Sequence, residues 1–237
     1  MIKYLVPALL LLTGCAAHRH EVNPYLVEPS STYLPPPKVA SVPSHYESKA
    51  AITVFLDPGH GGQDKGTSSK AKRLVEKNLN LETARRVERL LAQKGYRIFM
   101  SRRKDIFVPL LDRVQMAAKR QASLFVSIHY NFTKNTCISG TEIFYFHDPK
   151  QQSREKQSRL LASSILKKLT ATLPTPSRGV KSGNLCVIRE TSMPAVLVEA
   201  AFLSNPNDAQ LLLDASYRNK IAQAIAEGID EFCRSKT

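Results

Sequence analysis

Four polar side chains stand where the sequence pattern places the ends of strands or the start of a helix. His60 lies in Asp-Pro-Gly-His-Gly-Gly, His129 ends Val-Ser-Ile-His, and Glu199 ends Val-Leu-Val-Glu. Glu76 precedes a segment with helical spacing. Two histidines and one glutamate with an open fourth position make a catalytic zinc site, and a second carboxylate nearby acts as a general base. Taken singly, each residue also fits a structural hydrogen bond or a helix-end role.

The elements that would position these residues alternate between short apolar runs and segments with helical spacing. The runs predict strands at Ile52–Leu56, Tyr96–Met100, Leu124–Ile128, Glu142–Phe146 (as an edge strand), Leu185–Ile188 and Ala195–Val198. The helical spacing predicts helices around Leu81–Leu91, Leu110–Ala118, Leu161–Leu169 and Ile221–Phe232. This order predicts an α/β fold, a mostly parallel twisted sheet of about six strands with helices on both faces. Because parallel strands end at one edge of a sheet, we expect the four polar residues to converge there.

The composition favours a folded chain with an anionic partner. The 237 residues carry a formal charge of +14, and 43% of them are hydrophobic, enough for a full core. A basic surface fits nucleic acid, acidic lipid or an acidic cell-wall polymer. The sequence has few aromatic residues and lacks zinc-finger, helix-turn-helix and RNP-like patterns, so no nucleic-acid partner is expected.

The first 50 residues differ from the rest. Residues 1–14 predict a lipoprotein signal peptide, because one lysine precedes an apolar run that is too short to span a bilayer. Leu12-Thr13-Gly14-Cys15 resembles the bacterial lipobox, which implies cleavage before Cys15 and a lipid anchor on that residue. Residues 15–50 are then the lipidated cysteine and a proline-rich extended linker. Residue 16 is Ala rather than Asp, which resembles cargo of the outer membrane. The expected location is the cell envelope, on the periplasmic face.

The other cysteines are Cys137, Cys186 and Cys233, and no Cys-x-x-Cys spacing occurs. A zinc site built from thiolates is therefore not expected. If Cys15 carries lipid, three thiols remain, so at least one is unpaired. Two interpretations stay open: small buried apolar residues, or one disulfide with a third free thiol.

Several motifs together resemble the zinc-dependent N-acetylmuramoyl-L-alanine amidases of the Amidase_3 family. They are Asp-Pro-Gly-His-Gly-Gly, Glu-Lys-Asn-Leu-Asn-Leu from Glu76, Ser-Ile-His-Tyr-Asn around His129, and Pro-Ala-Val-Leu-Val-Glu ending at Glu199, followed by Phe-Leu-Ser-Asn. They occur in the family's order within residues 52–232, so residues 51–237 are expected to form the catalytic amidase domain.

The resemblance implies a role for each matching residue. His60, Glu76 and His129 would bind Zn²⁺, and Glu199 would take a proton from the zinc-bound water and later give it to the leaving amine. The substrate would be peptidoglycan, cut at the amide between N-acetylmuramic acid and L-alanine of the stem peptide. The positive charge suits carboxylate-rich stem peptides. Tyr130 replaces a usual small residue beside His129 and is expected to narrow the cleft.

Two alternatives to this enzyme remain. Ser-x-x-Lys strings occur at Ser69–Lys72, Ser101–Lys104, Ser153–Lys156 and Ser164–Lys167, and Lys181-Ser182-Gly183 resembles a Lys-Thr-Gly element. These resemble serine penicillin-binding D,D-carboxypeptidases, as a sole or a secondary activity. A non-catalytic wall-binding lipoprotein is the other alternative, and it predicts loss of one of the four site residues. For Asp57 two interpretations stay open, a strand-end turn residue or a hydrogen-bond partner that orients a metal ligand.

Overall fold

The computed structural model describes residues 51–69 and 71–235. The expectations for the signal peptide, Cys15 and the linker lie outside this range. The strands are β1 (Thr53–Pro58), β2 (Ser68–Ser69), β3 (Leu74–Val75), β4 (Arg97–Met100), β5 (Leu124–Asn131), β6 (Thr141–Tyr145), β7 (Ser177–Ser182) and β8 (Ala195–Phe202). The helices are α1 (Glu76–Gln93), α2 (Leu110–Lys119), α3 (Gln152–Thr172), α4 (Cys186–Arg189), α5 (Pro206–Leu211) and α6 (Ala215–Arg234).

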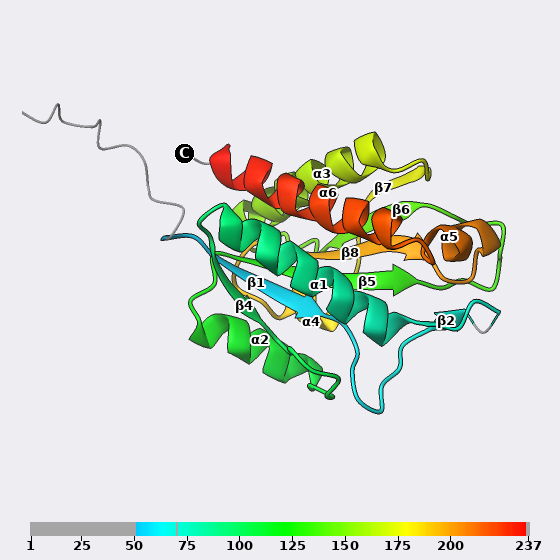
Figure 1. The fold of residues 1–237 in the computed structure, drawn as a ribbon. Coiled ribbons are helices and arrows are strands. Elements are labelled where there is room, and N and C mark those ends of the chain that lie inside the picture. Colours follow the sequence, from blue (N-terminus) through cyan, green and yellow to red (C-terminus); the bar gives the residue numbers. More distant parts are fainter. Residues whose placement is uncertain (1–50, 70, 236–237) are drawn as a thin grey trace, which may run out of the picture. The chain divides into compact units, whose positions relative to one another are not determined.

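Six strands form one sheet in the order β4-β1-β5-β8-β6-β7 (Figure 1). Strand β1 pairs in parallel with β4 and β5, β5 pairs in parallel with β8, and β6 pairs in parallel with β7. Only the pairing of β6 with β8 is antiparallel among these six strands. The expected fold, a mostly parallel sheet of six strands within an α/β protein, is therefore confirmed.

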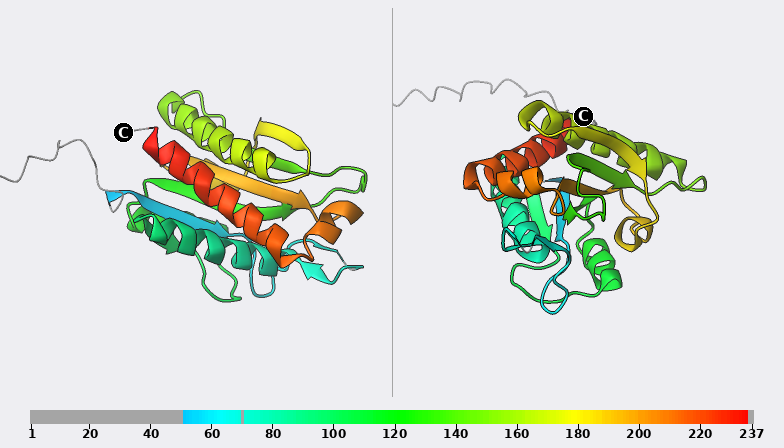
Figure 2. Two further views of the ribbon diagram at one scale, coloured as in Figure 1. Left: turned by 45° about the horizontal axis from the view of Figure 1, so that its top comes forward. Right: turned by 90° about the vertical axis from the view of Figure 1, so that its right-hand side faces the viewer.

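The sheet is buried on both faces because its strands alternate between two apolar cores. Val54 and Leu56 of β1 pack into the larger core with α1, α3 and α6, whereas Phe55 packs into a smaller core with α2 and α4. Figure 2 shows α1, α3 and α6 together on one face of the sheet. No helix of residues 51–69 and 71–235 is both long and apolar enough to cross a membrane.

Some strand predictions were wrong at one side of the sheet. Leu185–Ile188 was expected to be a strand, but Cys186–Arg189 forms the short helix α4. An apolar run of this length does not distinguish a strand from a buried helical turn. The strand at Glu142–Phe146 lies between β8 and β7 rather than at an edge. The true edge strand is β7, whose sequence Ser-Arg-Gly-Val-Lys-Ser has no apolar pattern that would reveal it.

The cysteines in the described part of the chain lie in three different environments. Cys137 is exposed and Cys186 is half-buried, and both carry free thiols. Cys233 belongs to α6 and is buried in the larger core. The expectation that at least one thiol is unpaired is confirmed, while the small-apolar interpretation fits Cys233 but not the exposed Cys137.

Candidate active site

His60 lies just beyond the end of the central strand β1, in a turn with an unusual backbone. Its φ angle is 60°, in the left-handed region, and Gly61 and Gly62 follow with φ angles of 131° and 61°. Reciprocal backbone hydrogen bonds between Gly61 and Asp64 close the turn at 2.8 and 3.2 Å. The Nδ1 atom of His60 lies 2.8 Å from Oδ2 of Asp64. Asp64 thereby fixes the imidazole so that Nε2 faces the other site residues.

Two buried arginines hold the backbone that carries His60. Arg102 donates from Nε to the Pro58 carbonyl at 2.9 Å and from Nη2 to the Gly59 carbonyl at 2.8 Å. Arg113 donates from Nη2 to the carbonyl of His60 at 2.9 Å. A left-handed conformation costs a non-glycine residue about 1–2 kcal/mol, so the surrounding contacts must stabilise it. These guanidinium hydrogen bonds supply that stabilisation.

Asp57 is a fully buried carboxylate beneath this turn. It accepts hydrogen bonds from Ser101 at 2.6 Å, from Ser127 at 2.9 Å and from Arg113 at 2.8 Å. Burial acts to raise its pKa, but the charge of Arg113 and the hydrogen bonds from Ser101 and Arg113 outweigh it and lower the pKa. Asp57 therefore supports His60 indirectly, through Arg113. This role is intermediate between a plain turn residue and a residue that hydrogen-bonds directly to a metal ligand.

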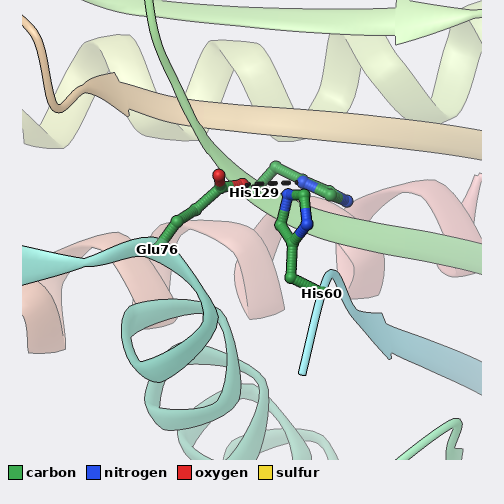
Figure 3. Close-up of side chains that lie close together, drawn as sticks. All are labelled: His60, Glu76 and His129. Carbon is green, nitrogen blue, oxygen red and sulfur yellow. Dashed lines mark hydrogen bonds and ion pairs between the residues drawn. The ribbon is translucent and has the colours of Figure 1, made fainter. Parts of the chain in front are cut away.

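Glu76 and His129 meet His60 at the carboxyl edge of the sheet. Glu76 is the first residue of α1, and its Oε1 atom lies 2.8 Å from Nδ1 of His129 and 3.1 Å from Nε2 of His60. Its other oxygen accepts the backbone N–H of Thr67 at 2.8 Å. Figure 3 shows the three side chains converging from the β1 turn, α1 and β5. Although burial acts to raise the pKa of Glu76, hydrogen bonds with both histidines outweigh it and hold that pKa far below its usual range.

The three side chains fit a metal ion. One ligand atom from each of His60, Glu76 and His129 lies within 4.8 Å of the other two. Two imidazoles and one carboxylate are a ligand set that binds catalytic zinc and leaves one position open. Space for this arrangement depends on Gly59, because a Cβ atom there would lie 2.0 Å from Cε1 of His129. The expected convergence of these three residues is confirmed in geometry.

Glu199 lies beside His129 in the neighbouring strand, since the two residues are register partners in β8 and β5. Strand alternation places both on the face of the sheet that carries Phe125 and Leu197 of the smaller core. The Oε2 atom of Glu199 is buried and has no hydrogen-bond partner in the described residues. Burial, and then the negative charges of Glu76 and Glu142, raise the pKa of Glu199 well above its usual value. A carboxyl group with a raised pKa retains a proton more readily than an exposed one and is suited to general acid–base catalysis.

Glu142 lies one strand beyond Glu199, so that His129, Glu199 and Glu142 stand side by side on neighbouring strands. It was not singled out from the sequence. It is the register partner of Glu199 across the antiparallel pair β6–β8. Asn131 donates to its Oε1 atom at 2.7 Å, and Lys181 donates to its Oε2 atom at 2.6 Å. The alternating pattern of residues 142–146 revealed the strand, but only knowledge of its neighbour could have placed Glu142 in the site.

A cavity of about 400 Å³ opens beside the two histidines. Its walls include Leu110, the first residue of α2, together with Phe107 in the loop before α2 and Leu185 just before α4. Tyr130 does not narrow it, so that expectation was wrong. Tyr130 is buried and its hydroxyl lies 2.8 Å from Oγ1 of Thr83 on α1, since successive strand residues point to opposite faces.

The serine alternative finds no support in the geometry. Ser101 is buried and donates to Asp57, while Lys167 pairs with Glu231 at 2.9 Å and Lys181 pairs with Glu142. Within the described residues, no side-chain hydrogen bond joins the serine and the lysine of any of these strings; Ser69 and Lys72 are linked only through their backbones, at 3.2 Å. The motif-like strings therefore do not assemble a Ser–Lys pair.

Fold and site together define an α/β protein with a His–Glu–His cluster that fits a metal ion, beside a second, partly buried carboxylate. The N-acetylmuramoyl-L-alanine amidase family model matches residues 54–231, and the chain belongs to that family. The expectation of an amidase-family enzyme is thereby confirmed.

Individual relatives agree with this membership. The chain is 43% identical over 182 residues to the N-acetylmuramoyl-L-alanine amidase LytC of Bacillus subtilis, covering 77% of this chain and 36% of LytC. It is similar in structure to an N-acetylmuramoyl-L-alanine amidase from Clostridium difficile 630, with TM-score 0.74, 35% identity, and coverage of 80% and 100%. Amidase AmiC2 of Nostoc punctiforme gives TM-score 0.72 and 32% identity, with coverage of 79% and 98%. The chain thus spans about a third of LytC but nearly the whole of the two solved domains.

Proposed function

We propose that this chain hydrolyses the amide between N-acetylmuramic acid and L-alanine of peptidoglycan. The observation that carries the proposal is the convergence of His60, Glu76 and His129 beside Glu199. Membership of the amidase family supports the substrate class. Because all four residues are present and adjacent, a non-catalytic wall-binding role is not favoured.

The chemistry divides between a metal site and a proton-transfer residue. His60, Glu76 and His129 would hold a zinc ion, which supplies Lewis-acid polarisation of the scissile carbonyl and a lowered water pKa. Glu199 accepts a proton from the attacking water and then donates it to the departing amine. Its raised pKa makes the protonated form accessible for the second step. Arg102, Arg113 and Asp64 keep His60 in position throughout.

For the N-terminal region we propose the lipoprotein signal, lipid attachment at Cys15 and a linker that extends from the membrane toward the wall. The support is the lipobox-like Leu-Thr-Gly-Cys and the proline-rich residues that follow it. The outer membrane, facing the periplasm, is the proposed location. Mass spectrometry of the mature N-terminus tests this: a diacylglyceryl-modified Cys15 is expected, and an unmodified N-terminus at another residue would contradict it.

The proposed reaction is tested by mass spectrometry of peptidoglycan digested with the purified protein. Free stem peptides and glycan strands without peptides are expected to accumulate together. A chelator should abolish both products, zinc should restore them, and a β-lactam should leave them unchanged. Release of only the terminal D-alanine, blocked by the β-lactam, would instead support the serine carboxypeptidase alternative.

A further inference from the structure

Two cations converge on one carboxylate at the edge of the sheet next to the site. Lys181 lies 2.6 Å and Arg178 lies 3.5 Å from the Oε2 atom of Glu142. The side chain of Glu142 is 7% exposed, whereas those of Arg178 and Lys181 are 33% and 40% exposed. The group of three therefore carries one surplus positive charge, and that charge faces solvent while the carboxylate lies beneath it.

This basic pair, Arg178 and Lys181, has unused hydrogen-bonding capacity. Oε1 of Glu142 is occupied by Asn131, so the carboxylate cannot satisfy both cations fully. The Nε atom of Arg178 is buried and lies 3.5 Å from Oε2 of Glu142, but it makes no hydrogen bond within the described part of the chain, so Glu142 holds Arg178 less closely than it holds Lys181. Its guanidinium lies 5.7 Å from the centre of the Phe202 ring, a contact that limits its orientation. A guanidinium held in this way beside an ammonium group suits a carboxylate ligand.

The basic pair lies on the far side of Glu199 from the metal cluster. Strands β5, β8, β6 and β7 are adjacent, so His129, Glu199, Glu142 and then the basic pair follow one another across the sheet. In the proposed reaction Glu199 donates its proton to the departing amine, and a peptide that continues from this amine away from the metal cluster crosses β6 and β7. Strands are spaced about 4.8 Å apart, which places β7 about 10 Å from the strand of Glu199.

We infer that Arg178 and Lys181 form a subsite for a carboxylate that the stem peptide carries about three residues beyond the scissile amide. An extended peptide advances about 3.3–3.6 Å per residue, so three residues span the distance to β7. This inference rests on the proposed amidase function. It assigns the basic edge of the site to recognition of the peptide rather than of the glycan.

The test compares two synthetic muramoyl tripeptides that differ only in a carboxylate or a carboxamide on the third residue. The unmodified protein should cleave the carboxylate form with a kcat/KM about tenfold higher than that for the carboxamide form, the size expected for a charge-assisted contact. The double variant Arg178→Gln with Lys181→Gln should lower this preference to less than about twofold. The matched control, Arg89→Gln with Lys220→Gln, removes the same charges from exposed positions on α1 and α6 and should retain the preference.

A second measurement does not depend on the folding of any variant. For the unmodified protein, the preference for the carboxylate form should fall as salt is raised, because an exposed ion pair is screened. Equal cleavage of both substrates, or full preference retained by the double variant, would overturn the subsite. If neither substrate is cleaved at the muramoyl amide, the amidase proposal itself fails and the subsite falls with it.

Discussion

At the scale of single residues, a polar network beneath the metal cluster keeps its ligands in place. Asp57 neutralises Arg113, Arg113 and Arg102 hold the carbonyl groups around His60, and Asp64 orients the ring of His60. Most of these groups are buried, so removing one leaves another without a partner, and such a loss is costly. Substitution of a buried member of this network should therefore mainly lower stability, and substitution of an exposed member that contacts a ligand should mainly weaken metal binding.

Asp57→Asn should destabilise the fold by about 3 kcal/mol near pH 7, because it leaves the buried Arg113 without its counter-charge. The pKa of Asp57 is lowered in the folded protein, so its contribution is fully present above the usual value of about 4. That contribution is lost as the pH falls through the lowered pKa. Urea unfolding of both proteins across this range checks it, and a stability difference that stayed constant down to about pH 2 would contradict the account.

Asp64→Asn should weaken zinc binding by about tenfold to a hundredfold, since partners that orient a ligand typically have effects of this size. Stability should change little, because the side chain of Asp64 is 42% exposed. Titration of zinc against a competing chelator gives the affinity. The exposed Asp112→Asn on α2 is the matched control. Equal affinity in the two variants would show that Asp64 does not position His60.

At the scale of elements, the site depends on how closely α3 and α6 pack on the sheet. Gly228 of α6 lies against the backbone of α3, where an added Cβ would be 2.4 Å from Cα of Ile165. This contact closes the larger core behind the strands that carry His129 and Glu199. The helix pair is thus a support for the site rather than a part of it.

Gly228→Ala should destabilise the protein by about 1–3 kcal/mol, because the two helices must separate to admit the methyl group. In an exposed helix the same change would stabilise by about 1 kcal/mol through helix propensity, so the sign of the effect tests the packing. Chemical denaturation measures it. A variant as stable as the parent or more stable would show that the helices are not in tight contact at this point.

At the scale of the whole molecule, the sequence was informative where burial imposes a pattern. The apolar runs before His60, His129 and Glu199 identified three central parallel strands, and parallel pairing then implied that their ends converge. The apolar pattern failed at the edge of the sheet formed by β6 and β7, because β7 is polar and β6 runs antiparallel to β8. Glu142 and the basic pair lie there. Their place depends on strand order, which residue periodicity does not encode.

The formal charge of +14 predicts a strong dependence of activity on ionic strength. On anionic wall polymer, the protein should lose activity several-fold between about 0.05 and 0.3 M salt, because salt screens the attraction between the basic protein and the polymer. Hydrolysis of a small, uncharged muramoyl peptide should be much less sensitive. Rates on sacculi and on that peptide, measured in parallel, check the prediction, and identical salt profiles would refute it.

The central claim is that a metal held by His60, Glu76 and His129 works together with proton transfer by Glu199. The most direct test measures zinc content and turnover of Glu199→Gln beside those of His129→Ala. Glu199→Gln should retain about one zinc ion per chain and lose at least about a hundredfold in kcat, the lower bound typical of general acid–base catalysis. His129→Ala should lose both zinc and turnover. Substantial turnover by Glu199→Gln with its zinc bound would contradict the account.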